Sequence, residues 1–143
     1  MQKPNLVFVV ADDVSPRYHG CYGGPTPTPN IDRLATGGVR FDRGYGCSSL
    51  CCPSRYNLFT GNYAQRSRWA YQDVPPNEPA LVSQNGMLDP ETPTLPKKLK
   101  AAGYRTGHIG KWHSRFDTRD FGFDEPTKIK GNADDPDVDA EIR

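Results

Sequence analysis

The sequence lacks a charge imbalance and a long apolar run. Its 143 residues carry 18 basic and 17 acidic side chains, a net charge of +1. A nearly neutral chain has no bulk electrostatic attraction to nucleic acid or to an anionic membrane surface. No apolar stretch approaches the roughly 20 residues that a membrane-spanning helix needs. The composition therefore predicts neither a nucleic-acid partner nor a membrane span.

Paired cysteine spacings are also missing. The four cysteines are Cys21, Cys47, Cys51 and Cys52, and no two of them form a Cys-x-x-Cys pair. Structural zinc sites are usually built from such pairs, so a zinc protein is not expected. A disulfide between the neighbours Cys51 and Cys52 would be strained. The sequence neither requires nor excludes a bond between Cys21 and Cys47.

Apolar residues are scarce as well. They make up 35% of the chain, while glycine and proline number 14 each. The length suits one domain with a core, but this composition is poor for a self-sufficient one. Either the chain is a loop-rich domain or it is part of a larger protein, and we favour the second interpretation.

The first apolar run predicts a buried strand. Residues 5–11, "NLVFVVA", are apolar and rich in β-branched side chains, as in a strand covered on both faces of a parallel sheet. The run is too short for a signal peptide and continues into Asp12 and Asp13 instead of a cleavage site. Ligands bind beyond the carboxyl ends of such strands, so these two carboxylates are well placed for chemistry.

The remaining pattern alternates helices with strands, which predicts an α/β fold. Helices are expected where a proline near the start and a glycine at the end bound a helical pattern, and strands where apolar residues alternate. The expected helices are 29–38, 53–60 and 92–103, and the further expected strands are 39–45 and 105–113. A long surface excursion follows the second helix, and residues 124–143 form an acidic, loop-like connection.

Cys51 is expected at a helix N-terminus. The unpaired N–H groups and positive dipole end there stabilise anions and lower a thiol pKa. Arg55, four residues later, can donate a fork of hydrogen bonds to an oxyanion. This pattern favours an anionic substrate or a nucleophile that becomes anionic. The alternative is an ordinary buried cysteine beside a structural arginine.

Several motifs identify a family. "CCPSRYNLFTG" fits Cys-x-Pro-Ser-Arg with Leu58, Thr60 and Gly61 at fixed offsets, and this resembles the signature of the type I sulfatases. "NLVFVVADD", "TPNIDRLATGGVRF" and "TLPKKLKAAGYRTGHIGKWH" are similar to further segments of that family, in the same order. The resemblance implies an alkaline phosphatase-like α/β sandwich, with a mostly parallel central sheet flanked by helices. It covers the chain to about Phe123, so residues 1–123 would be the N-terminal part of the catalytic domain.

The resemblance also implies roles for individual residues. The family oxidises its motif cysteine to formylglycine, whose hydrated aldehyde is the nucleophile, and Cys51 holds that position. Arg55 would hold the formylglycine and its oxyanion, whereas Cys52 would be a bystander. Asp12, Asp13 and the modified Cys51 would ligate a divalent cation, calcium or alternatively magnesium.

Lys111 and His113 would contact the sulfate and the formylglycine hydroxyl. Two residues apart, they would project from one face of a continuing strand. One hydroxyl of the hydrated aldehyde would attack sulfur, and the other would then expel sulfate and restore the aldehyde. An ordinary serine at this position would instead be left with a stable sulfate ester after the attack. His19 and His108 are interpreted as structural or surface residues.

The resemblance has gaps. Family members commonly have arginine where this chain has Asn62, and they complete the metal site and the leaving-group site with residues from a much longer chain. We therefore expect the N-terminal portion of a sulfatase, inactive by itself. A phosphate or phosphonate ester hydrolase and a non-catalytic anion- or metal-binding remnant stay as alternatives.

Partners and compartment follow from the same resemblance. The implied partners are a sulfated small molecule or glycan and a formylglycine-generating maturation enzyme. Family members are commonly periplasmic, lysosomal or secreted, but residues 5–11 are not predicted to be an export signal. The sequence therefore leaves the compartment undecided.

Overall fold

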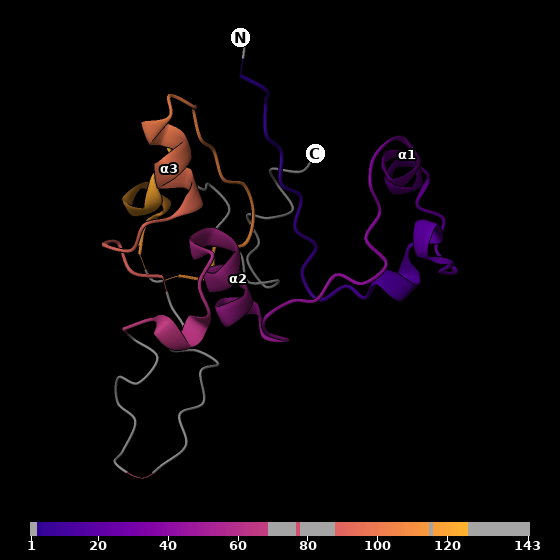
Figure 1. Ribbon diagram of the computed structural model, residues 1–143, viewed down its shortest axis with the longest axis horizontal. Helices are drawn as coiled ribbons and strands as arrows, with labels where there is room; N and C mark the ends of the chain where they lie inside the picture. The colour runs from indigo at the N-terminus through magenta and orange to yellow at the C-terminus, as the bar shows by residue number, and fades with distance from the viewer. Residues whose placement is uncertain (1–2, 69–76, 78–87, 115, 126–143) are drawn as a thin grey trace, which may run out of the picture. The chain divides into compact units, whose positions relative to one another are not determined.

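The computed structural model of the chain describes residues 3–68, 77, 88–114 and 116–125. These residues divide between two compact units, Met1–Tyr45 and Gly46–Arg143 (Figure 1). The helices within the described ranges are α1 (Pro29–Gly37), α2 (Cys51–Thr60), α3 (Leu95–Ala101) and four short 3-10 helices, η1 (Pro16–Tyr18), η2 (Gly20–Tyr22), η3 (Ala64–Arg66) and η4 (Thr118–Phe121). In the described part of the chain, every helix is too short or too polar to cross a membrane.

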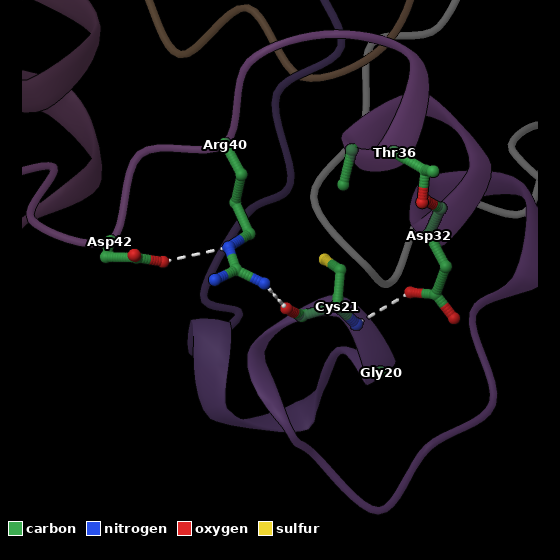
Figure 2. A pocket seen from close by; sticks show the side chains of 7 residues that line it. Gly20, Cys21, Asp32, Thr36, Arg40 and Asp42 are labelled. Carbon is green, nitrogen blue, oxygen red and sulfur yellow. Dashed lines mark hydrogen bonds and ion pairs between the residues drawn. The ribbon is translucent and has the colours of Figure 1, made fainter.

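In the first unit, α1 is joined to η2 through one carboxylate. Asp32, in the first turn of α1, accepts hydrogen bonds at Oδ1 from the Cys21 amide at 2.7 Å and from the Thr28 hydroxyl at 2.8 Å. Arg40 donates from Nη1 to the Cys21 carbonyl at 2.6 Å and from Nε to Asp42 at 2.8 Å (Figure 2). Polar contacts therefore hold this unit together, since none of its helices contains a buried residue.

In the second unit, α2 and α3 confirm the predicted helices. The α2 helix ends at Gly61, whose φ of 69° lets its N–H reach the Asn57 carbonyl at 2.8 Å. The α3 helix begins after Thr94, whose hydroxyl accepts from the Lys97 amide, and Pro96 lies in the first turn, where its missing N–H costs nothing. The two helices pack against each other (Figure 1).

The core of the second unit is mostly aromatic. Phe121 is fully buried, and its ring centroid lies 5.1 Å from that of Trp112. Phe59 and His108 add their rings to the cluster, each 5.3 Å from Trp112. Tilted and edge-to-face pairs at such distances are the favoured arrangements of aromatic rings. The buried members of this core are Tyr56, Ala64, Leu88, Trp112, Phe121 and Phe123.

Polar bonds fasten the last described segment to α3. Thr106 donates from its hydroxyl to the Gly122 carbonyl at 2.6 Å and from its amide to Asp124 at 2.8 Å. Asp124 also pairs with Lys100 of α3 at 2.6 Å. Gly122 has a φ of 96°, and an added Cβ would lie 2.6 Å from the Lys97 nitrogen, so only glycine fits there.

We expect Asp124 to make this segment less stable at low pH. The hydrogen bond from Lys100 and then that from the Thr106 amide lower the pKa of Asp124 from 3.8 to about 2. The stabilisation is therefore complete above pH 3.8 and is lost as the pH falls towards 2. Asp124→Asn should unfold with a smaller pH dependence across that interval, as measured by urea titration at each pH. Equal slopes for both proteins would contradict the prediction.

The predicted strands are not confirmed. Residues 5–11, 39–45 and 105–113 are all described, and none of them forms a strand. Among the described residues, β pairing is limited to the isolated bridges His19–Thr26 and Gly107–Glu125. A strand needs a neighbour to bond with, and the side chains from Leu6 to Val10 are 48–90% exposed, with no sheet beside them among the described residues.

Two further predictions fall mostly on residues outside the described ranges. The surface excursion after α2 includes residues 69–76 and 78–87, which lie outside the described part. The same holds for residues 126–143 of the acidic connection. Asp124 and Glu125, its first two residues, are described and exposed.

Candidate active site

Cys51 is the first residue of α2. Leu50 before it is extended, with φ −102° and ψ 143°, so the chain turns into the helix at the cysteine itself. The dipole of this ten-residue helix is positive at residue 51, although Pro53 contributes no N–H to the first turn. Cys51 is half-buried, and this position suits a side chain that carries negative charge during a reaction.

Two contacts join the N-terminal half of α2 to a distant segment. Arg55 donates from Nη1 to the Lys111 carbonyl at 2.6 Å. Cys52 Sγ lies 4.0 Å from the His113 carbonyl oxygen. The structure thus brings the backbone of Lys111 and His113 next to the helix that carries Cys51 and Arg55, although 56 and 61 residues separate the two contacting pairs.

The backbone of the 111–113 segment departs from the expected strand. His113 has a φ of 59°, in the left-handed region, and its side chain is exposed, whereas Lys111 is half-buried. The argument from strand alternation is therefore wrong here, because the chain is not extended at residue 113. Between the two, Trp112 is buried and donates from Nε1 to the Phe116 carbonyl at 2.7 Å, which anchors the segment in the core.

The two neighbouring cysteines differ in their surroundings. Cys52 is 6% exposed, the most buried of the four cysteines, whereas Cys51 is only partly covered. Burial raises the pKa of the Cys52 thiol, the neighbouring Cys51 raises it further, and Arg55 opposes this. Cys52 is therefore held as a neutral thiol at neutral pH, which suits packing and not nucleophilic attack.

Asp12 and Asp13 belong to the first unit. Both are exposed and lie in a bend, and Asp13 has a φ of 57°. Asp13, Asn77 and His113 are the three non-glycine residues with positive φ in the described ranges, so two of the three are predicted site residues. Such conformations cost about 1–3 kcal/mol and cluster at functional sites.

Asp12 and Asp13 offer the oxygen ligands that a hard cation prefers, but they are too few to complete its coordination. Calcium takes six to eight oxygen ligands, and Asp12 and Asp13 supply two side chains. Within the described part of the chain, no three histidine, cysteine, aspartate or glutamate side chains lie together as a metal site would require. These two residues are therefore part of a cation site at most.

A hollow of about 500 Å³ lies in the first unit, between η2 and α1. Figure 2 shows Asp32 and Arg40 reaching Cys21 from opposite sides. The hollow contains none of the residues that the sequence predicts to be catalytic or metal-binding. Its lining residues are Gly20, Cys21, Asp32, Ala35, Thr36, Arg40 and Asp42.

Comparison with known proteins identifies the chain. The sulfatase family model matches residues 4–140, nearly the whole length. The chain belongs to the sulfatase family. Family membership implies the alkaline phosphatase-like α/β fold, although the described residues contribute helices and no strands of it.

Curated sulfatases resemble the chain over most of its length. Human arylsulfatase A is 44% identical over 111 residues, which are 77% of this chain and 21% of that protein. Human steryl-sulfatase is 43% identical over 115 residues, covering 78% and 19%. An N-acetylgalactosamine-6-O-sulfatase of Bacteroides thetaiotaomicron is 40% identical over 113 residues, covering 78% and 21%. The chain thus spans about a fifth of the length of these sulfatases.

One contact of this sulfatase chain escaped prediction. The motif predicts that Cys52 is a bystander, because its second position accepts many residue types. The structure instead buries it against the His113 carbonyl. No sequence signal pointed to this contact, since it depends on how residues 111–113 fold back onto α2.

We expect His108 to make the stability of the second unit fall in mild acid. Burial in the aromatic cluster, and then the charge of Arg55, lower the pKa of His108 below its ordinary 6.5. The unfolded chain then binds a proton more tightly than the folded one, so stability decreases as the pH falls below 6.5. Urea titrations at pH 7.5 and 5.5 should show a larger loss for the wild type than for His108→Gln. An equal loss in both would contradict a buried neutral imidazole.

Proposed function

We propose that the full-length protein hydrolyses sulfate monoesters with a formylglycine formed from Cys51. The observation that carries the proposal is the meeting of the Cys-x-Pro-Ser-Arg turn with Lys111 and His113, through the bond from Arg55 to the Lys111 carbonyl. Family membership supports the reaction type. The start of α2 supports the position of the nucleophile, because its amides and dipole favour an oxyanion there.

Each residue near the helix has a distinct task in this proposal. Residue 51, as a hydrated aldehyde, would attack sulfur with one hydroxyl, so that the S–O bond to the alcohol breaks and the alcohol leaves with a proton. Deprotonation of the second hydroxyl would then break the C–O bond to the sulfate and restore the aldehyde, which water hydrates again. Lys111 neutralises charge on the sulfuryl oxygens, and His113 holds or moves the proton of the formylglycine hydroxyl. Arg55 would hold the formylglycine and its oxyanion, and its bond to the Lys111 carbonyl also ties α2 to the 111–113 segment.

A divalent cation completes the proposed site. Calcium, or magnesium in its place, would be held by Asp12, Asp13 and the oxygen of modified residue 51, together with ligands beyond these residues. It would supply positive charge next to the sulfate oxygens. With so few ligands of their own, residues 1–143 alone should turn over no substrate.

The proposed partners are a formylglycine-generating maturation enzyme and a sulfated small molecule or glycan. The relatives named above are an arylsulfatase, a steryl-sulfatase and an amino-sugar sulfatase. Their names have only the sulfate ester in common. The shared chemistry therefore supports a sulfate ester as the substrate. Residues outside this chain would determine which alcohol the ester carries.

Mass spectrometry tests the proposal directly. The tryptic peptide 44–55 of the full-length protein, expressed with the maturation enzyme, should lose the mass that accompanies conversion of the Cys51 thiol to an aldehyde. The matured protein should then hydrolyse an aryl sulfate. An intact thiol would support a non-catalytic remnant, and faster hydrolysis of a phosphate diester or phosphonate than of the sulfate would support the related esterase.

A further inference from the structure

Cys52 contacts the 111–113 segment in a way that its place in the motif does not explain. Its sulfur lies 4.0 Å from the His113 carbonyl oxygen across 61 residues of chain. Its side chain is 6% exposed, so it lies in the packed interior of the second unit. Pro53, which follows, is buried too, so this edge of the first turn of α2 faces the protein and not solvent.

Three consecutive residues of the segment are fixed by three different contacts. Arg55 bonds to the carbonyl of Lys111 at 2.6 Å, and Trp112 is buried with its ring nitrogen on the Phe116 carbonyl. The contact of Cys52 with His113 is the third. Together these contacts span the residues that carry two predicted catalytic side chains.

The backbone of His113 needs such support. A non-glycine residue with a φ of 59° is strained, and this conformation persists only where the surroundings determine it. The carbonyl of His113 is the group that the Cys52 thiol faces. If φ at residue 113 changed, the carbonyl and the exposed imidazole would turn together about the N–Cα bond.

We propose that Cys52 is a positioning residue of the active site: its buried thiol holds the His113 carbonyl and so sets where the His113 imidazole lies relative to residue 51. This proposal rests on the proposed function, because His113 acts only if the sulfatase reaction takes place. Cys52 takes no part in the chemistry. The second motif position is therefore not neutral in this chain.

Core packing is the competing explanation, and two substitutions separate it from positioning. Cys52→Ser keeps a donor on a smaller and more polar side chain, whereas Cys52→Val keeps an apolar, slightly larger side chain and has no donor. If packing alone matters, valine should replace cysteine better than serine does. If the contact with the His113 carbonyl matters, serine should be the better replacement. Cys52→Ala removes both properties.

The test measures kcat and KM for an aryl sulfate with the full-length matured protein, normalised to the formylglycine content at residue 51. We expect Cys52→Ala and Cys52→Val to lower kcat about 3- to 10-fold, because small misplacements of catalytic groups reduce rates strongly. KM should change less than about twofold, since the ground-state contacts with sulfate stay. Cys52→Ser should recover most of kcat. Cys47→Ala is the matched control, since Cys47 is exposed and lies outside α2, and it should behave as wild type.

A second measurement does not depend on activity. Hydrogen–deuterium exchange at the amides of residues 112–114 should be faster in Cys52→Ala and Cys52→Val than in wild type and Cys52→Ser. Wild-type kcat in the valine variant, an equal loss in all three variants, or unchanged exchange would overturn the proposal. A wild-type protein without sulfatase turnover would instead overturn the proposed function, while the exchange result would still decide whether Cys52 holds the segment.

Discussion

Replacing Cys51 by serine is expected to end multiple turnover of sulfate esters by the full-length protein. The hydrated aldehyde proposed at residue 51 has two hydroxyls, one to attack sulfur and one to expel the sulfate. A serine has one, so it can accept the sulfuryl group but cannot release it. Loss of a nucleophile costs on the order of 10⁴-fold or more in kcat. Steady-state hydrolysis of an aryl sulfate measures the loss.

The serine variant also makes a second, positive prediction. Intact mass spectrometry after incubation with substrate should show up to one sulfuryl group bound per chain, at residue 51. Cys47→Ser is the control, because the substitution is identical but Cys47 is exposed and precedes α2. That variant should hydrolyse the aryl sulfate at the wild-type rate, and its mass should show no bound sulfuryl group. Undiminished turnover by Cys51→Ser would show that the nucleophile lies elsewhere.

Phe121→Ala is expected to give the largest loss of stability in the second unit. Phe121 is fully buried, and its ring lies 5.1 Å from Trp112 and 6.3 Å from Phe116. Removing a buried phenylalanine ring costs about 3–5 kcal/mol, because apolar contacts are lost and a cavity remains. The tryptophan beside the cavity reports the change. Urea unfolding of the chain, followed by tryptophan fluorescence, gives the free energy of unfolding.

Ile109→Ala is the control for that measurement. Ile109 is a large apolar residue of the same unit, but its side chain is 88% exposed. Its removal should change the free energy of unfolding by no more than about 0.5 kcal/mol. Equal effects of the two substitutions would mean that the aromatic cluster does not form the core of this unit.

The helices could be predicted because their ends are encoded locally. The α2 and α3 helices each begin near a proline, and Gly61 and Gly103 lie at or just after the two ends. These residues act through backbone geometry within one turn, which needs no distant partner. The helix predicted at residues 29–38 is confirmed as α1 for the same reason, since Pro29 is its first residue.

The strands could not be predicted with the same success, because a strand depends on its neighbours. The run at residues 5–11 has the composition of a buried central strand, yet its side chains are exposed in the described structure. The composition of a segment indicates the surroundings in which it would be stable. A strand is stable only when another strand is paired beside it. The helices carry their hydrogen bonds within themselves and do not have this dependence.

The sequence predicts the candidate site as a set of residue types but not as a geometry. The motif named Cys51 and Arg55, and the Gly-Lys-Trp-His stretch named Lys111 and His113. The left-handed backbone at His113 and the burial of Cys52 depend on the packing of two segments far apart in the chain. Nothing in the sequence around either residue specifies that packing.

The 61-residue separation of Cys52 and His113 has a consequence during translation. A ribosome adds roughly 5–20 residues per second, so His113 follows Cys52 after about 3–12 s. Throughout that interval the start of α2 cannot be held by the 111–113 segment, which has not yet been made. A maturation enzyme that acts on the nascent chain in this interval would meet Cys51 before the 111–113 segment contacts the start of α2.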